Sequence, residues 1–276
     1  MRSAENGVER RFCRIGILAG TIAVGFLLSG CAAGPSPKEK LAAAYQELDN
    51  PAPNYASVID ASDAYLKANP TGPAAADALY LHGRALEGQA QQDVAAAPKD
   101  SAEAYNYYSQ ALTQKPRPAL EGLIHAQMGN VLYFQDRYSA ALDELSAGYE
   151  KLERDADKAW ALYRIGLCNQ RLGKWGEADK YFASVQQQFP DTVQAQRARE
   201  HQGATAFWLQ VGTYASPAAA DAVTNDLKRQ GLMAQRFHDT VRNVQYVRVG
   251  PLGTYDSAVA AKQRVLAKYR DAIILP

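Results

Sequence analysis

The chain contains little cysteine or histidine, and it carries almost no net charge. Its 276 residues include 3 Cys, 4 His and 13 Pro, and the formal net charge is +1. An ordinary proline content and a hydrophobic fraction of 47% exclude a disordered, collagen-like or multi-span membrane chain. A net charge near zero argues against a chain that binds nucleic acid over its whole surface. The length suits one large or two ordinary packed domains.

Residue patterns typical of catalysis are also missing. Cleavage of a glycan requires a pair of placed carboxylates, and cleavage of an amide requires zinc ligands or a nucleophile with its base. Neither pattern occurs at a recognisable spacing among the carboxylates, the 4 His or the cysteines. We therefore predict that the chain is not an enzyme and has no catalytic residue, metal site or cofactor.

The near-zero net charge hides an asymmetry along the chain. Residues 31–206 carry 17 Lys/Arg and 22 Asp/Glu, whereas residues 207–276 carry nine Lys/Arg and five Asp/Glu. Opposite charges on adjacent segments are typical of separate surfaces with separate partners, although a few charges of either sign also serve solvation alone.

The N-terminus has the pattern of an export signal. Residues 1–14 are polar and end in basic residues, and residues 15–28 are almost purely apolar or Gly/Ala. This apolar run is shorter and richer in small residues than a typical membrane span. It predicts a secretory signal peptide over residues 1–30, with a retained anchor helix as the alternative.

The end of this segment, Leu28-Ser29-Gly30-Cys31, resembles the bacterial lipoprotein box. The resemblance implies that the Cys31 thiol is acylated as a thioether and that Cys31 becomes the first residue of the mature chain. It also implies that Ala32 directs the protein to the outer membrane, on its periplasmic face. Residues 31–40, which include Gly-Pro-Ser-Pro, are then a short lipid-anchored tether.

The remaining cysteine has no partner. Cys13 lies in the signal peptide and Cys31 is the lipidation site, so we expect no disulfide to Cys168. Cys168 lies in an apolar helical run, which favours an inert buried thiol.

Residues 41–201 are rich in Ala, lack β-branched runs and place apolar residues at helical spacing, which predicts stacked helices. A repeat with a period of 37 brings Gly129 into register with Gly166. The second-helix positions that follow are Tyr138, Ala141 and Leu145 in one copy and Trp175, Ala178 and Phe182 in the next. Small residues recur where two helices touch, and large residues where a groove is filled.

This pattern resembles the tetratricopeptide repeat family, and Gly83 with Tyr108 marks a third copy. The resemblance implies an all-α solenoid whose concave side binds a protein partner, here unidentified. The segment around 89–100 is longer than in the other copies and predicts an expanded loop. Tyrosines at helical spacing either line the concave side or pack in the core: Tyr45, Tyr55, Tyr105, Tyr107, Tyr133 and Tyr163. We interpret His82 and His125 as packing residues rather than metal ligands.

The pattern changes after residue 206. Alternating aromatic and β-branched residues predict strands near 207–211, 232–238, 244–249 and 273–275, and two amphipathic helices separate them. The order is βαββαβ, a small α+β domain over residues 207–276. This order places both helices on one face of an antiparallel sheet and leaves the other face uncovered.

Two stretches of this domain, 208–214 (WLQVGTY) and 247–252 (VRVGPL), resemble the signatures of the SPOR domain. The resemblance implies binding to peptidoglycan glycan strands that have lost their stem peptides. It places Gln210 on the family's Gln and Thr213 on its usual Ser, whereas Tyr246 stands where the family commonly has Arg.

Period-two alternation predicts that one set of strand residues points away from the helices: Trp208, Gln210, Tyr246 and Arg248. Flat aromatic faces suit the C–H side of a sugar ring, and a Gln amide offers both a donor and an acceptor. Arg248 is able to pair with the lactyl carboxylate that a missing stem peptide leaves free. With Thr213, these residues form the predicted glycan-binding site; the alternative is that they are merely solvated, with Trp208 covered by the preceding helix.

The sequence therefore predicts a non-catalytic outer-membrane lipoprotein that binds peptidoglycan and recruits a protein partner, in cell division or envelope organisation. In a second interpretation, the repeats serve outer-membrane assembly and the C-terminal domain only localises the protein. The same strand order occurs in RNA-recognition modules. The export signal and the missing aromatic-rich third-strand motif argue against a nucleic-acid partner.

Overall fold

The computed structural model describes residues 34–92 and 97–276. The predicted signal peptide and Cys31 lie outside the described residues. Within the described ranges, no helix combines the length and the apolar character needed to cross a membrane.

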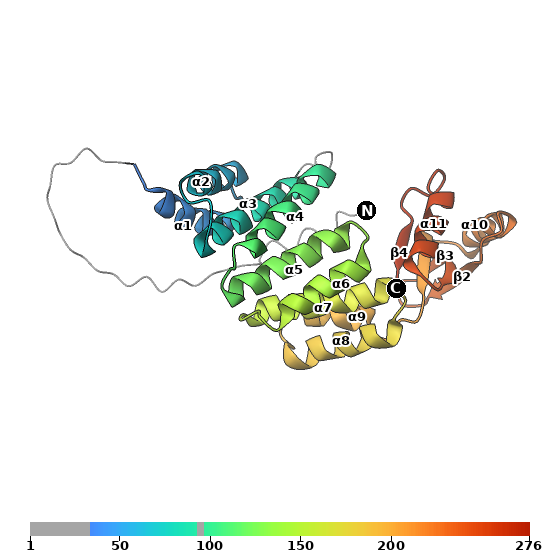
Figure 1. The fold of residues 1–276 in the computed structure, drawn as a ribbon. Helices are drawn as coiled ribbons and strands as arrows, with labels where there is room; N and C mark the ends of the chain where they lie inside the picture. Colours follow the sequence, from blue (N-terminus) through green and yellow to red (C-terminus); the bar gives the residue numbers. More distant parts are fainter. Residues whose placement is uncertain (1–33, 93–96) are drawn as a thin grey trace, which may run out of the picture. The chain divides into compact units, whose positions relative to one another are not determined.

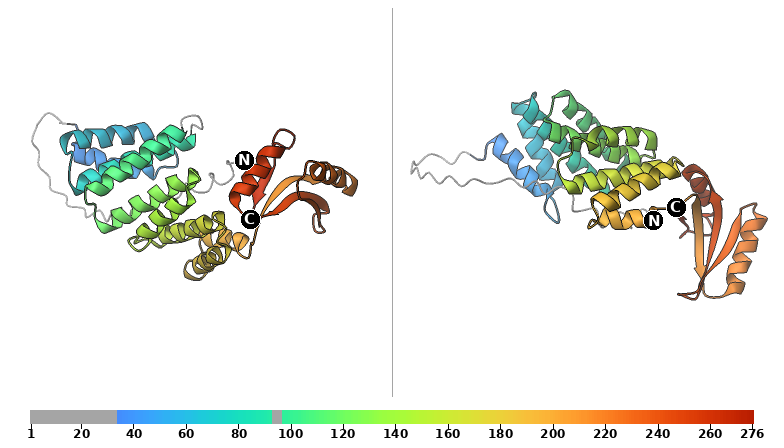
Figure 2. Two further views of the ribbon diagram at one scale, coloured as in Figure 1. Left: turned by 45° about the vertical axis from the view of Figure 1, so that its right-hand side comes forward. Right: turned by 90° about the horizontal axis from the view of Figure 1, so that it is seen from below.

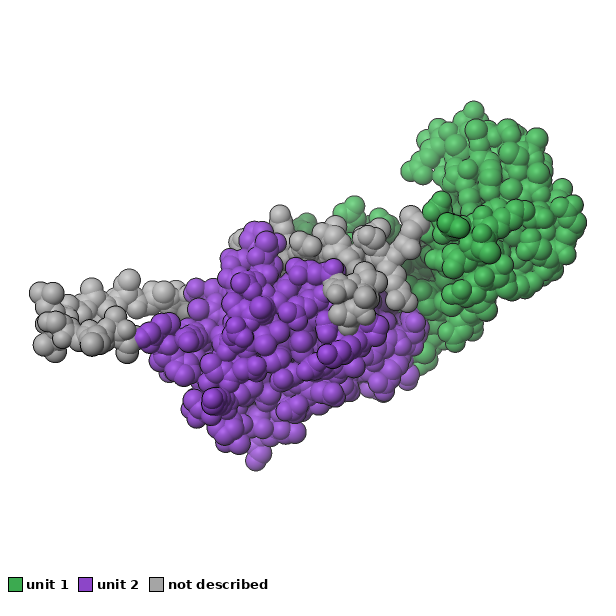
Figure 3. Space-filling view, turned by 90° about the horizontal axis from the view of Figure 1, so that it is seen from above, with its two compact units in different colours: residues 1, 162–276 green, residues 2–161 purple. Residues whose placement is uncertain are grey.

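The described chain begins with helices and ends with a small mixed domain (Figure 1). The helices before the sheet are α1 (Pro37–Leu48), α2 (Tyr55–Ala68), α3 (Pro73–Gln92), α4 (Ala97–Thr113), α5 (Pro118–Phe134), α6 (Tyr138–Tyr149), α7 (Asp155–Arg171), α8 (Trp175–Gln188) and α9 (Val193–His201). The mixed domain contains β1 (Phe207–Tyr214), α10 (Pro217–Arg229), β2 (Ala234–Asp239), β3 (Val244–Leu252), α11 (Tyr255–Val265) and β4 (Ile273–Leu275). The chain forms two compact units that divide between residues 161 and 162, inside α7 (Figure 3).

The first helix begins inside the segment predicted as a tether. Ser36 caps α1 by accepting a hydrogen bond from the Glu39 backbone N–H, and the Glu39 carboxylate accepts one from the Ser36 N–H at 2.7 Å. This reciprocal capping satisfies N–H groups that a helix start leaves without partners. Of the described residues, only 34–36 therefore precede the first helix.

Glycines of the first helix of each repeat contact a large side chain of the second helix. A Cβ atom built on Gly83 would lie 2.5 Å from the Tyr108 ring, and one on Gly129 would lie 2.6 Å from Leu145 Cγ. In the unit after residue 161, a Cβ on Gly166 would lie 2.6 Å from Phe182 Cε1. The predicted register of small and large residues is therefore confirmed in all three copies.

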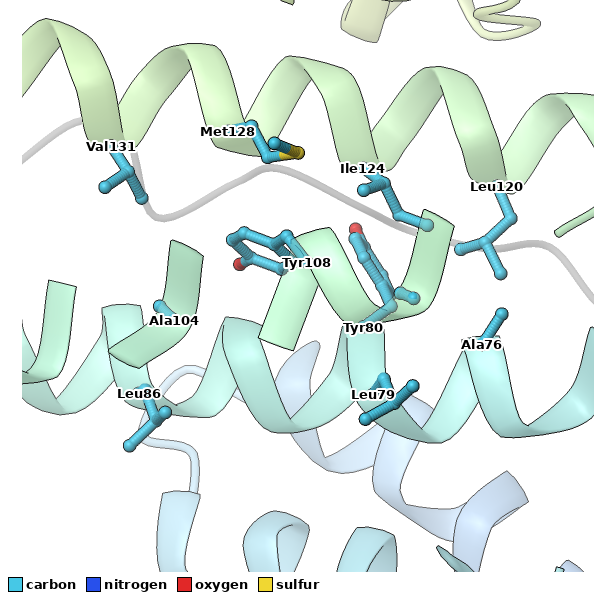
Figure 4. Close-up of a cluster of buried hydrophobic side chains, with 11 residues drawn as sticks. Ala76, Leu79, Tyr80, Leu86, Ala104, Tyr108, Leu120, Ile124, Met128 and Val131 are labelled. Atoms are coloured by element: carbon cyan, nitrogen blue, oxygen red, sulfur yellow. The ribbon is translucent and has the colours of Figure 1, made fainter. Parts of the chain in front are cut away.

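The core between α3, α4 and α5 shows the result of this packing (Figure 4). Tyr80 and Tyr108 lie between the backbone of α3 and the apolar side chains of α5, among them Ile124 and Met128. Tyr108 and Ile124 are completely buried. Burying such a side chain contributes about 1.5–3 kcal/mol, so each helix pair depends on its neighbour for stability.

Most of the predicted loop over residues 89–100 is helical. The helix α3 continues to Gln92, and α4 already begins at Ala97. The prediction of an expanded loop was therefore wrong for these parts, because an Ala- and Gln-rich sequence has the propensity to extend the flanking helices.

The tyrosines of the helical region are mainly packing residues. Tyr133 and Tyr163 are buried, at 5% and 6% exposure, so they do not line an open surface. The other four tyrosines are half-buried and pack against the cores of the N-terminal unit: Tyr45, Tyr55, Tyr105 and Tyr107.

The two histidines of interest lie in ordinary packing positions. The His82 ring stacks on Tyr107 at a centroid distance of 3.8 Å. The Nδ1 atom of His125 lies 2.7 Å from a Glu144 carboxylate oxygen. No group of three or more metal-ligating side chains gathers anywhere in residues 34–92 or 97–276.

Cys168 is fully buried and has no disulfide partner among the described residues. Burial raises the pKa of its thiol to about 12. The thiol is therefore protonated at neutral pH, which agrees with the predicted inert core thiol.

The sheet has the strand order β2-β3-β1-β4, and every neighbouring pair is antiparallel. Helices α10 and α11 pack on one face of the sheet (Figure 2). The core between them joins sheet residues such as Leu209 and Val247 to helix residues such as Leu227 and Val265. The predicted βαββαβ order is confirmed, with β3 extending to Leu252 rather than ending at Val249.

Candidate functional site

The face of the sheet opposite α10 and α11 carries the residues predicted as a site. We call it the open face and define it by six side chains: Trp208, Gln210, Thr213, Phe237, Tyr246 and Arg248. The alternate positions on β1 and β3 are buried at 0–4% exposure: Leu209, Val211, Val247 and Val249. Trp208 and Arg248 are half-buried. The predicted alternation of the two strands is confirmed.

A β-bulge brings Thr213 onto the open face. Simple alternation from Leu209 would place Thr213 on the side of the helices. The register shifts between Gln210 and Gly212, so that Thr213 pairs with Tyr246 and is exposed. An extra residue in a bulge redirects the side chains that follow it.

The indole of Trp208 lies against a glycine of the neighbouring strand. A Cβ atom on Gly250 would lie 2.9 Å from Trp208 Cε3 and 3.0 Å from the Phe207 carbonyl oxygen. Gly250 also has a φ of +147°, which side-chain-bearing residues rarely adopt. The Trp208 ring meets the Phe237 ring edge to face, with centroids 5.4 Å apart. Backbone and ring together fix the orientation of the indole.

Arg248 is held at the centre of the open face. Its Nε–H donates to Gln210 Oε1 at 3.2 Å, and its guanidinium lies 5.4 Å from the Phe237 ring centroid and 5.3 Å from that of Tyr246. No carboxylate of the described residues forms an ion pair with Arg248. The guanidinium therefore keeps N–H groups for an external acceptor.

Two opposite charges at the edge of the open face, those of Asp239 and Arg242, neutralise each other. The Tyr246 hydroxyl donates to Asp239 Oδ2 and accepts from Arg242 Nη1, both at 3.2 Å. Hydrogen bonds from the Arg242 and Val241 backbone N–H groups and from Tyr246, together with the Arg242 charge, lower the pKa of Asp239. Asp239 is therefore ionised at neutral pH and is balanced by Arg242, which leaves Arg248 as the uncompensated charge of the open face.

Sequence analysis missed Phe237 on β2, which contacts several members of the open face. It pairs across the strands with Tyr246 and contacts Trp208 and Arg248 through its ring. Alternation from the buried Ala234 would have placed Phe237 on this face, since its strand was predicted.

The arrangement of the open face suits the binding of a sugar or an acidic group. Aromatic rings pack well on the C–H faces of sugars, and the Gln210 amide and Arg248 guanidinium offer hydrogen bonds to hydroxyl, N-acetyl or carboxylate groups. The Asp239 carboxylate at the edge of the open face accepts a hydrogen bond from the Tyr246 hydroxyl, which in turn accepts one from Arg242.

Comparison with protein families identifies two segments of the chain. The SPOR domain family matches residues 203–276, and a tetratricopeptide repeat family matches residues 160–192. No curated protein matches the chain.

Two solved structures are similar to this chain at low sequence identity. The structure titled as that of the MamA protein has 15% identity and a TM-score of 0.46, and the match covers 88% of this chain and 100% of that one. The structure titled as YrrB, a TPR protein with an unusual peptide-binding site, has 18% identity and a TM-score of 0.39, with 79% of each chain covered.

Both matched families are typically binding modules without catalytic activity. A SPOR domain indicates binding to peptidoglycan, and tetratricopeptide repeats indicate interaction with a protein partner. The chain is thus a protein of helical tetratricopeptide-like repeats followed by a C-terminal SPOR domain.

Proposed function

We propose that this protein is a non-catalytic outer-membrane lipoprotein that binds glycan strands of peptidoglycan with the open face of its SPOR domain and a protein partner with its repeats. The lipid on Cys31 would hold the repeats near the membrane, and the SPOR domain would attach them to the cell wall. Such a link serves cell division or envelope organisation.

The observation that carries this proposal is the uncompensated Arg248 between aromatic rings. Loss of a stem peptide leaves the lactyl group of muramic acid as a free carboxylate beside the sugar ring. A guanidinium can pair with that carboxylate in a bidentate geometry, while Trp208 lies against the apolar face of the sugar. A strand with its peptides in place offers an amide at the same position, so the open face favours denuded strands.

A pelleting experiment tests this preference. We expect residues 34–276 to co-sediment with amidase-treated sacculi more strongly than with untreated sacculi. Equal pelleting with both preparations would reject selectivity for denuded strands.

Two arginines of the same domain offer a matched pair of variants. Arg248→Gln removes the central charge of the open face, whereas Arg229→Gln removes the same charge from α10, which packs on the opposite face. We expect Arg248→Gln to weaken pelleting about tenfold, as expected for loss of a charged hydrogen bond of about 1.5 kcal/mol, and Arg229→Gln to leave it unchanged. Equal loss in both variants would indicate a non-specific charge effect.

Amidation of the muramic carboxylates separates the charge contribution from stacking. After carbodiimide coupling of the denuded sacculi to ammonia, wild type and Arg248→Gln should bind equally weakly. A Trp208→Ala change should weaken binding to both preparations, with circular dichroism showing that the domain is still folded. An Arg248→Gln defect that persists on amidated sacculi would contradict the predicted ion pair.

The lipid anchor and the cellular position need separate tests. Cys31→Ser should release the full chain from the membrane fraction, and unchanged fractionation would refute acylation at Cys31. A fluorescent fusion of the full chain should form a band at the division septum. A uniform signal along the cell envelope would instead support general tethering or assembly.

A further inference from the structure

The connection between the last repeat and the SPOR domain is short and is fastened to α8. Only residues 202–206 separate the end of α9 from the start of β1. The Gly203 backbone N–H donates to Asp179 Oδ1 at 2.9 Å, and Gln186 Nε2 donates to Gln202 Oε1 at 2.7 Å. A connection held in this way differs from the flexible linkers that usually separate domains.

Phe207, the first residue of β1, is buried outside the core of its own sheet. It has 1% exposure but does not belong to the cluster between the sheet and α10 and α11. Its ring lies 4.8 Å from the Trp175 ring of α8 and 5.5 Å from the Tyr255 ring of α11. Phe207 is therefore buried between a repeat helix and the SPOR domain.

A cation from the repeats completes this aromatic cluster. The Arg171 guanidinium, at the end of α7, lies 3.6 Å from the centroid of the Tyr255 ring and 5.8 Å from that of Phe207. A cation near a ring face is attracted by the ring quadrupole, and the attraction grows when water is excluded. The α7–α8 turn lies close to the segment between β3 and α11, since a Cβ atom on Gly173 would lie 3.4 Å from the Gly253 carbonyl oxygen, an ordinary van der Waals distance.

We infer that these residues form an intramolecular docking surface that makes the last repeat and the SPOR domain one rigid module. The docking surface consists of Arg171 and Trp175 from the repeat and Phe207 and Tyr255 from the SPOR domain. Separation would expose three large aromatic rings in one place, a patch that folded proteins usually cover. The inference does not depend on what the open face binds.

Rigid docking has a consequence for how the protein works. Phe207 precedes Trp208 directly in the sequence, so the docked residue and the open face share one strand. The α7–α8 turn is then occupied by the SPOR domain and is not available to a protein partner. The open face keeps a fixed orientation relative to the last repeat, and a load on the sheet passes to α8 without a flexible joint.

Distance measurements between spin labels test this inference. Labels on Lys180→Cys in α8 and Asn225→Cys in α10 use exposed positions, and the buried Cys168 stays unlabelled in the native chain. In residues 34–276 we expect one narrow distance distribution. A distribution as broad as that of a freely moving pair of domains would overturn the inference.

Variants at the docking surface make the test specific. Arg171→Gln should broaden the distribution roughly twofold, because the cation that bridges the two rings is lost. Lys174→Gln removes the same charge from an exposed position of the same turn and should leave the distribution unchanged. Arg171→Lys should restore much of the narrow distribution. An unchanged distribution in Arg171→Gln would overturn the proposal.

A second pair of variants covers the case in which Arg171→Gln disturbs α7. Tyr255→Phe keeps the ring and should keep the narrow distribution, whereas Tyr255→Ala should broaden it. Circular dichroism at 222 nm confirms that each variant is folded. Equal distributions in the two Tyr255 variants would also reject the docking surface.

Discussion

Gly166 offers a direct test of how the repeats are packed. A methyl group at this position would lie 2.6 Å from Phe182 Cε1 and 2.8 Å from Cδ1, closer than real Cβ contacts allow. Phe182 is fully buried, and its ring lies 6.0 Å from Tyr163 and 5.5 Å from His201. The ring is thus confined, and Gly166→Ala must displace α8 or force Phe182 out of its rotamer.

Two effects of opposite sign set the size of the change. Overpacking of a filled core costs about 1–3 kcal/mol, and replacing Gly by Ala within a helix returns about 1 kcal/mol of propensity. We expect Gly166→Ala to lower the free energy of unfolding by about 1 kcal/mol, a drop in Tm of roughly 2–4 °C. The control is Gly176 in α8, where a Cβ would meet no atom within 4 Å. Gly176→Ala should stabilise the chain by a few tenths of a kcal/mol up to about 1 kcal/mol.

Urea unfolding followed at 222 nm measures this difference in the helical part of the chain. The two variants should shift the midpoint in opposite directions with an unchanged slope. The double change Gly166→Ala with Phe182→Leu should recover part of the loss, because the smaller side chain makes room for the methyl group. If Gly166→Ala proved as stable as Gly176→Ala, the proposed contact between Gly166 and Phe182 would be refuted.

Three further predictions concern Cys168, Gly250 and Asp226. The Cys168 thiol should resist a disulfide reagent at pH 8 in the native chain and react at once in denaturant, because burial raises its pKa to about 12; rapid native labelling would contradict this. Gly250→Ala should lower the free energy of unfolding of the SPOR domain by about 1–3 kcal/mol and change the near-ultraviolet circular dichroism signal of Trp208. An unchanged spectrum would argue against the close approach of Gly250 and the indole. Asp226 accepts a hydrogen bond from Lys268, and this contact lowers the pKa of Asp226 in the folded chain. The ionised Asp226 therefore stabilises the fold above about pH 4, and this stabilisation is lost as the pH falls through the lowered pKa of the folded state. Asp226→Asn should therefore reduce the acid sensitivity of the SPOR domain, and an unchanged pH profile of Tm would show that this ion pair has no effect.

Local patterns explain why much of the fold was predictable from the sequence. The register of Gly83, Gly129 and Gly166 with large residues follows from contacts between adjacent helices, which the sequence repeats directly. The order of strands and helices in the SPOR domain likewise follows from short-range periodicity and from capping residues such as Ser216.

Features that depend on contacts between residues far apart in the sequence were harder to predict. The bulge at residues 210–212 depends on pairing with β3, and without it Thr213 would lie on the other face. Phe207 is buried because it contacts Trp175 of the repeat helix α8, and the periodicity of β1 does not predict this contact. The extension of α3 to Gln92 reflects helix propensity, whereas the loop was predicted from the spacing of the repeats alone.

Tyr246, which stands where the SPOR family commonly has Arg, reduces the number of free charges on the open face. Its hydroxyl joins the Asp239 and Arg242 pair, so this position adds a ring but no free charge. Arg248 then provides the only uncompensated cation among the open-face residues, and its guanidinium lies over the Tyr246 and Phe237 rings. Salt screens one exposed ion pair but not the apolar contact with a sugar ring. Binding to denuded glycan should therefore weaken only slightly with added salt, and Arg248→Gln should remove that salt dependence. A steep loss of wild-type binding with added salt would mean that charges beyond the open face make the main contribution.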